Sequence, residues 1–198
     1  MTILEKMPDT AAARRAMIDS QLRVSGVNDP AIIAAFAAVP RDEFVPAAVK
    51  AAAYVDRAVA LADGHMLAAP LFYGRMLTEA GLGPQDTVLV VSPCGYLAAL
   101  VEALGCPVER MDPAQAAAAR KSTARASVIL IDGAIEQLPA GLASRLADGG
   151  RIVTGLAERG VTRLATGTRT AGDVALLPLA EMGIPVLAEF AAPRRWSF

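Results

Sequence analysis

Two runs of four consecutive aliphatic residues constrain the fold of this chain more than any other feature. The runs are residues 88–91 (VLVV) and 128–131 (VILI). A strand with one face in water alternates apolar and polar side chains, whereas a continuous apolar run is typical of a parallel strand covered on both faces. The sequence therefore predicts two central, parallel and adjacent strands with helices on both sides of their sheet.

The segments around these runs alternate between helical and extended patterns. Spacing and capping residues predict helices over 10–24, 30–39, 71–80, 97–104, 113–121 and 136–147, with strands at 108–111 and 151–154. After Gly160, short alternating segments between Gly and Pro turns indicate antiparallel strands. Together they predict a three-layer α/β fold with an antiparallel edge. We expect one domain over 1–198, with a helical cap region at 1–81 and the sheet with its flanking helices at 82–198.

Length and charge exclude several classes of protein. A chain of 198 residues suits one well-buried domain. A net charge of −1 gives no electrostatic basis for binding nucleic acid. No apolar run approaches the roughly 20 residues that a membrane helix needs, so we expect no membrane partner. The first ten residues lack the basic start and apolar stretch of a signal peptide, and the cytoplasm is the expected location.

The cysteines do not form a metal-binding pattern. Cys94 and Cys106 are twelve positions apart, and His65 is the single histidine of the chain. Zinc sites usually combine four closely spaced Cys and His ligands. We therefore expect no metal site and interpret both cysteines as small packed hydrophobic residues.

A series of residues with fixed types and spacings runs along nearly the whole chain. It comprises Met17-Ile18-Asp19-Ser20-Gln21-Leu22, Gly26, Asp29, Val39-Pro40-Arg41, Phe44-Val45-Pro46 and Tyr54-Val55-Asp56-Arg57, then Gly64, Pro70, Val88-Leu89, Gly95-Tyr96, Glu109-Arg110, Leu138-Pro139, Leu146 and Gly149-Gly150. This series resembles that of protein-L-isoaspartate O-methyltransferases. The resemblance implies a Rossmann-like methyltransferase sheet, mostly parallel with an antiparallel C-terminal edge. It also implies S-adenosylmethionine as cofactor and an isoaspartyl polypeptide as the methyl acceptor.

The turn after the first apolar run departs from that family. The family's turn reads roughly Glu-Ile-Gly-Thr-Gly-Ser-Gly-Tyr, and the corresponding residues here are Val90-Val91-Ser92-Pro93-Cys94-Gly95-Tyr96, one position short. Glycines in such a turn let a ligand approach the backbone. Only Gly95 remains, and Pro93 removes a backbone N–H. These substitutions argue against cofactor binding in the family's manner, although Gly95 and Tyr96 keep their places.

The resemblance assigns two further contacts to the cofactor. Glu109 falls where the family has the acid that accepts hydrogen bonds from the ribose, but a surface Glu after a strand is also ordinary. The family's third strand and its Gly-Asp-Gly turn near the adenine have no counterpart, because residues 120–126 lead directly into the run at 128. A strand with its return connection needs at least about ten residues. We therefore expect the sheet to lack one edge strand.

The acceptor side is altered as well. The family has a Ser that handles the substrate carboxylate, and Ala68 stands in its place without a hydroxyl. His65 replaces a glutamine, and it either approaches a ligand or is a solvated loop residue. Asp132 follows the second apolar run, where it either meets a ligand or caps the next helix.

Three interpretations of function remain open. An active isoaspartyl methyltransferase agrees with the N-terminal region and Glu109. A non-catalytic member would serve as a binding or interaction module, and a third possibility is a methyltransferase with a changed cofactor mode or substrate. The residues that would carry chemistry have departed from the family while the packing residues have not, which favours the second interpretation. A homo-oligomer is left open.

Overall fold

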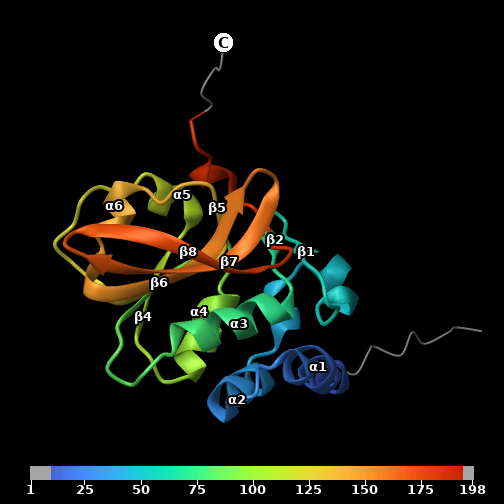
Figure 1. Cartoon of the computed structure of the whole chain (residues 1–198). Coiled ribbons are helices and arrows are strands. Elements are labelled where there is room, and N and C mark those ends of the chain that lie inside the picture. The colour runs from blue at the N-terminus through green and yellow to red at the C-terminus, as the bar shows by residue number, and fades with distance from the viewer. Residues whose placement is uncertain (1–9, 194–198) are drawn as a thin grey trace, which may run out of the picture.

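A six-stranded sheet forms the centre of the computed structural model, which describes residues 10–193 (Figure 1). Its strands, in spatial order, are β4 (Val108–Met111), β3 (Val88–Val91), β5 (Ala126–Ile135), β6 (Leu146–Glu158), β7 (Val161–Thr170) and β8 (Asp173–Glu181). The first four are parallel, and β7 and β8 continue from β6 as an antiparallel meander. The predicted α/β fold with an antiparallel C-terminal edge is confirmed.

The two apolar runs lie side by side, as predicted. Val88 pairs with Val128 and Val91 with Ile131 in parallel register, and every residue of both runs is buried. Alternate residues face two separate cores: Val88 and Leu130 belong to one, Leu89 and Ile131 to the other. The sheet is therefore covered on both faces, which explains why neither run contains a polar residue.

The missing edge strand is also confirmed. After β4 the chain forms the short helix α5 (Pro113–Ala117) and then an irregular segment over 118–125 that leads directly into β5. No strand lies among these described residues, so β4 is the edge of the sheet.

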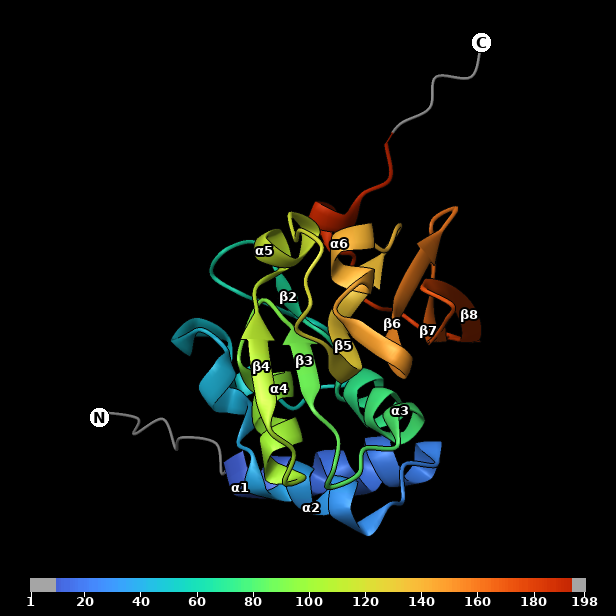
Figure 2. The ribbon, with the colours of Figure 1, turned by 90° about the vertical axis from the view of Figure 1, so that its left-hand side faces the viewer.

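Helices form layers on both faces (Figure 2). On one face, α3 (Pro70–Ala80) contacts β5, β6 and β7, and α4 (Tyr96–Ala103) contacts β3 and β4. A further layer of α1 (Thr10–Met17) and α2 (Pro30–Ala38) lies beyond them, with α2 packed on both α3 and α4. The opposite face carries α5, α6 (Ala140–Ala143) and the 3₁₀ turn η5 (Ala188–Phe190).

The remaining N-terminal elements are short. They are the π turn η1 (Ile18–Leu22), the 3₁₀ turns η2 (Arg23–Ser25), η3 (Arg41–Phe44) and η4 (Ala47–Ala52), and the hairpin of β1 (Val59–Ala60) and β2 (Met66–Leu67). Leu22, Ile32, Ile33, Phe36 and Val39 are buried, as we expect for the helical region. Val24, which we expected to be buried, is 74% exposed on η2, and Phe44 is half-buried.

Several element boundaries differ from the sequence prediction. The helix expected over 136–147 is wrong except for Ala140–Ala143, because Ile135 and its neighbours extend β5 and Leu146 already pairs with Ala126 in the sheet. The helix expected over 113–121 ends at Ala117. The strand expected at 151–154 is the middle of the longer β6, and the segments after Gly160 form two long strands rather than several short ones.

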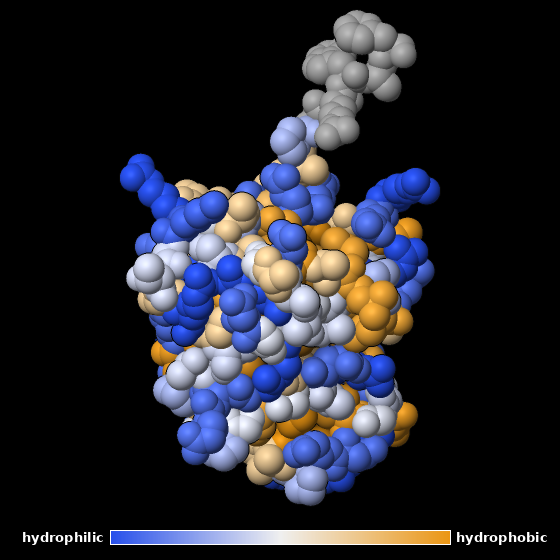
Figure 3. Space-filling model, turned by 60° about the vertical axis from the view of Figure 1, so that its left-hand side comes forward, coloured by the Kyte–Doolittle hydropathy of each residue, from blue (hydrophilic) through white to orange (hydrophobic). Residues whose placement is uncertain are grey.

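The surface gives no sign of a membrane span. Among the described residues, no helix combines the length and hydropathy needed to cross a bilayer. On the face shown in Figure 3, polar residues predominate and apolar ones form separate patches.

Gly141 in α6 is the point where the shortened connection passes closest to a neighbouring element. A Cβ at this position would lie 1.6 Å from the carbonyl oxygen of Ala119. We expect Gly141→Ala to lower the free energy of unfolding by about 1–3 kcal/mol, because backbone rather than a flexible side chain must move. Urea denaturation measures this change.

Gly183→Ala is the matched control, since no heavy atom lies within 4 Å of its Cβ position and its backbone is not left-handed. This control should change the free energy by less than about 0.5 kcal/mol. Equal effects of the two substitutions would contradict the close packing of the 118–125 segment on α6.

Candidate functional site

The turn between β3 and α4 is held by a side chain rather than by glycine flexibility. Ser92 Oγ lies 2.7 Å from Asp132 Oδ2, contacts the carbonyl oxygen of Cys94 and accepts a hydrogen bond from the Cys94 N–H at 3.2 Å. A hydroxyl has one hydrogen to donate, whereas two acceptors surround it here. The Ser92 hydroxyl hydrogen is therefore shared between the Cys94 carbonyl and the Asp132 carboxyl group.

Asp132 lies at the carboxyl end of β5 with only 2% of its surface exposed. Burial raises the pKa of this carboxyl to about 6, against the opposing effects of hydrogen bonds from Ser92 and Tyr73 and of the Arg41 charge. Its Oδ1 atom has no hydrogen-bond partner among the described residues. Asp132 thus lies within β5, just after the run that pairs with β3, and its side chain points into the protein.

Arg41 completes this buried cluster and was not assigned a role from the sequence. Its side chain is fully buried, with Nε donating to the Ala53 carbonyl at 2.6 Å and an NH2 group donating to the Ala68 carbonyl at 2.5 Å. The guanidinium lies over the rings of Tyr73 and Tyr96, 5.6 and 5.2 Å from their centroids. Arg41 thus joins the N-terminal region to the loop before α3. The sequence signal was an arginine in the Val39-Pro40-Arg41 motif.

Cys94 and Tyr96 are packed against the buried cluster. Burial, with the nearby Asp132 charge, raises the pKa of the Cys94 thiol to about 11, so the thiol is protonated at neutral pH. Tyr96 is fully buried, with its ring 5.4 Å from that of Phe44 and 5.1 Å from that of Tyr73. Both cysteines are free thiols.

A small hollow lies over this turn, and a half-exposed arginine, Arg110, forms part of its wall. It has a volume of about 190 Å³ and is lined by Val90, Ser92, Cys94, Gly95, Ala98, Arg110 and Met111. An Arg110 NH1 group is 3.6 Å from the position that a Cβ would take on Gly95. The guanidinium is held there by Glu102, whose two oxygens are 2.7 and 2.8 Å away. The Arg110–Glu102 pair thus covers the side of the turn that Gly95 leaves open.

Glu109 is not brought to this turn. Consecutive residues of a strand point to opposite faces, and Arg110 occupies the face of α4. Glu109 instead pairs with Arg145, with both carboxylate oxygens 2.6 Å from the guanidinium. The expected acid therefore lies away from Gly95 and Tyr96.

The loop before α3 places Ala68 and His65 in different surroundings. Ala68 is buried, and its N–H donates to the Tyr73 hydroxyl at 3.1 Å. His65 lies between two carboxylates, with Nδ1 2.9 Å from Asp63 and Nε2 2.8 Å from Glu189. Burial lowers the pKa of His65, but its hydrogen bonds to the Glu189 and Asp63 carboxylates and their charges outweigh this effect, so the pKa is raised. His65 thus joins the β1–β2 hairpin to η5, and the interpretation as a freely solvated loop residue is wrong.

A second, wider hollow lies beside this loop and the start of α3. Its volume is about 390 Å³, and it is lined by Asp56, Arg57, Ala58, Ala69, Leu71, Phe72, Met182 and Gly183. The lining is mostly apolar and includes one acidic side chain, Asp56, and one basic side chain, Arg57.

The titration of Asp132 predicts a pH dependence of stability. Its pKa rises from the ordinary 3.8 to about 6 on folding, so the folded state prefers the protonated form. Stability is therefore fully present below pH 4 and falls as the pH rises from about 4 to 6, by up to roughly 3 kcal/mol. We expect Asp132→Asn to remove this fall, measured by urea denaturation across that range.

Comparing wild type with Asp132→Asn separates the titration of Asp132 from that of the other carboxyl groups. Asp19→Asn, at a site 72% exposed, is the control and should follow the wild-type profile. Parallel profiles for wild type and Asp132→Asn would show that Asp132 is already ionised at pH 4.

Comparisons with known proteins agree with this geometry. The family model described as protein-L-isoaspartate(D-aspartate) O-methyltransferase matches residues 12–110. The protein-L-isoaspartate O-methyltransferase of Koribacter versatilis is 33% identical over 168 residues, which cover 72% of this chain and 76% of that protein. The enzyme of the same name from Methylorubrum extorquens is 38% identical over 105 residues, covering 52% of this chain and 46% of its own length.

Solved structures show the same fold. A putative protein-L-isoaspartate O-methyltransferase from Plasmodium falciparum, in complex with S-adenosyl-L-homocysteine, has a TM-score of 0.70 and 15% sequence identity. The match covers 89% of this chain and 98% of that one.

Proposed function

The chain belongs to the protein-L-isoaspartate O-methyltransferase family, and we propose that it is a member that has lost methyl transfer and retained the binding of polypeptide. The observation that carries this proposal is the Arg110–Glu102 pair over Gly95. In Rossmann-like folds the cofactor lies against the turn after the first strand, where a side chain now stands.

The cofactor side supports a loss of binding. The hollow at the turn measures about 190 Å³, whereas small-molecule pockets are roughly 300–1,000 Å³. Pro93 offers no N–H to a ligand. Glu109, the expected ribose partner, is bound to Arg145. These residues do not fit S-adenosylmethionine held in the family's manner, so we derive no step through it.

The acceptor side supports retained binding. The hollow of about 390 Å³ is formed by Asp56 and Arg57 of the family-like motif together with the start of α3. Arg41 fixes the Ala68 carbonyl and so holds the loop that forms one wall. Ala68 has no hydroxyl with which to handle a carboxylate, so this side is suited to binding rather than to catalysis.

Two features beyond activity remain predictions from the sequence: the single domain over 1–198 and the cytoplasmic location. The possible homo-oligomer stays open.

Titration with S-adenosylhomocysteine tests the loss of the cofactor. A ligand at one hundred times its Kd stabilises a protein by about 2.7 kcal/mol, or roughly 5–10 °C in Tm for a domain of this size. We expect no shift at millimolar S-adenosylhomocysteine or S-adenosylmethionine, with an active family member as positive control. A shift with methyl incorporation into an isoaspartyl peptide would overturn the proposal. A shift without incorporation would indicate a changed cofactor mode or substrate.

Peptide binding tests the retained function. We expect an isoaspartyl peptide to bind, and Arg57→Gln to raise its Kd about tenfold through loss of a charge-assisted hydrogen bond. Fluorescence anisotropy measures both. Arg23→Gln is the control with the same change in charge, on η2 outside the hollow, and should leave the Kd unchanged. Binding that is insensitive to Arg57 would place the polypeptide elsewhere.

A further inference from the structure

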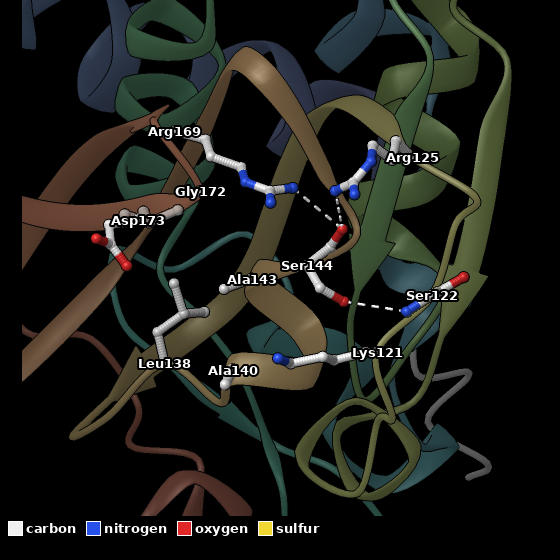
Figure 4. A pocket seen from close by; sticks show the side chains of 11 residues that line it. Lys121, Ser122, Arg125, Leu138, Ala140, Ala143, Ser144, Arg169, Gly172 and Asp173 are labelled. Atoms are coloured by element: carbon white, nitrogen blue, oxygen red, sulfur yellow. Dashed lines mark hydrogen bonds between the residues drawn. The ribbon is translucent and has the colours of Figure 1, made fainter.

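A larger cavity, of about 540 Å³, lies beside the first residues of β5 and β6, away from the Ser92–Asp132 cluster (Figure 4). It is lined by Lys121, Ser122, Arg125, Leu138, Ala140, Ala143, Ser144, Arg169, Gly172, Asp173 and Val174. Its walls are the irregular 118–125 segment, α6, and the turn between β7 and β8. The chain that takes the place of the family's third strand therefore forms one side of this cavity.

Positive charge dominates the lining. Lys121, Arg125 and Arg169 contribute three cations, and Asp173 contributes one acid. In Figure 4 the Arg125 and Arg169 side chains converge beside Ser144, while Lys121 and Asp173 extend from other walls. Lys121 and Arg125 belong to the 118–125 segment, and Arg169 and Asp173 lie on either side of the β7–β8 turn.

The two guanidinium groups share the same neutral acceptors. Arg125 NH1 donates to the Ser144 carbonyl at 2.5 Å and to the Leu146 carbonyl at 3.3 Å. Arg169 NH1 donates to the same oxygens at 3.3 and 2.5 Å. The NH1 atoms of Arg125 and Arg169 are thus no farther apart than the sum of two hydrogen bonds that meet at one oxygen. Two positive charges this close repel each other. Carbonyl groups carry no net charge, so they do not cancel the repulsion between the two guanidinium groups.

Arg169 is the strongest sign that an anion belongs here. It is only 9% exposed, and its Nε atom has no hydrogen-bond partner among the described residues. Asp148 approaches Nε to 3.2 Å without hydrogen-bond alignment, and its carboxylate is 76% exposed. A solvated acid of this kind compensates a buried cation weakly. Only the NH1 groups of Arg125 and Arg169 donate to the Ser144 and Leu146 carbonyls. Further N–H donors of both guanidinium groups are left available.

We propose that this cavity binds a small phosphate ester. The phosphate lies between Arg125, Arg169 and Lys121, since guanidinium groups match phosphate oxygens in charge and geometry. Asp173 accepts a hydrogen bond from a hydroxyl or amino group on the remainder of the ligand. A volume of about 540 Å³ falls within the range of small-molecule sites and exceeds the space that one phosphate fills.

Calorimetric titration of the full chain with inorganic phosphate and with ribose 5-phosphate tests this site. Both should bind with one site per chain, and the ester should bind more tightly. Lys121→Gln should raise both dissociation constants about tenfold through loss of one charge-assisted contact. Arg120→Gln is the matched control: the same charge is removed one residue away, from a side chain outside the lining, and the constants should stay the same.

Asp173→Asn separates the two parts of the ligand. It should tighten inorganic phosphate, because a negative charge leaves the cavity, and it should reduce the advantage of the ester. Lys121, Arg120 and Asp173 are all exposed, so the variants should fold, and a circular dichroism melt checks this. The proposal is overturned by the absence of binding, by equal losses in Lys121→Gln and Arg120→Gln, or by equal affinity for phosphate and ester. None of these outcomes depends on peptide or S-adenosylhomocysteine binding.

Discussion

Arg41 places a full positive charge in the interior of this protein, and the surrounding structure is arranged around it. Its guanidinium donates to the carbonyls of Ala53 and Ala68 and lies over the rings of Tyr73 and Tyr96. A buried charge is costly unless its hydrogen bonds and electrostatic partners are supplied. These partners come from η4, the loop before α3, α3 and α4. The position of the N-terminal region on the sheet is therefore coupled to one side chain.

The same cluster explains how the β3–α4 turn holds its shape without the family's glycines. The Ser92 hydroxyl bonds within the turn and to Asp132, so it is engaged by the protein itself. A ligand that bonded to this hydroxyl would have to break these internal hydrogen bonds. This arrangement supports the proposed loss of cofactor binding.

The sequence predicted what depends on local pattern and missed what depends on distant partners. The parallel pairing of β3 with β5 followed from two wholly apolar runs, and the missing edge strand followed from a 120–126 connection too short for the family's third strand. The direction of Glu109 was missed, because a shift of one residue in a strand exchanges its two faces. The pairing of His65 with Glu189 joins residues 124 positions apart, and no local pattern encodes it. The helix over 136–147 failed because helical spacing there competes with pairing to β5.

The sheet lacks the family's third strand, and Glu109 and Arg110 on β4 therefore lie at its edge. β4 is now an edge strand, and an uncovered edge offers unpaired backbone groups to other chains. Glu109 is tied to Arg145 on one face and Arg110 to Glu102 on the other, so charged side chains flank this short strand. Charged residues on an edge oppose pairing with another sheet. At the opposite edge, β8 exposes Leu177 but carries Pro178, which cannot donate a backbone hydrogen bond. The Glu109-Arg110 pair, which resembles the family's motif, thus lies on an edge strand and places charge on both of its faces.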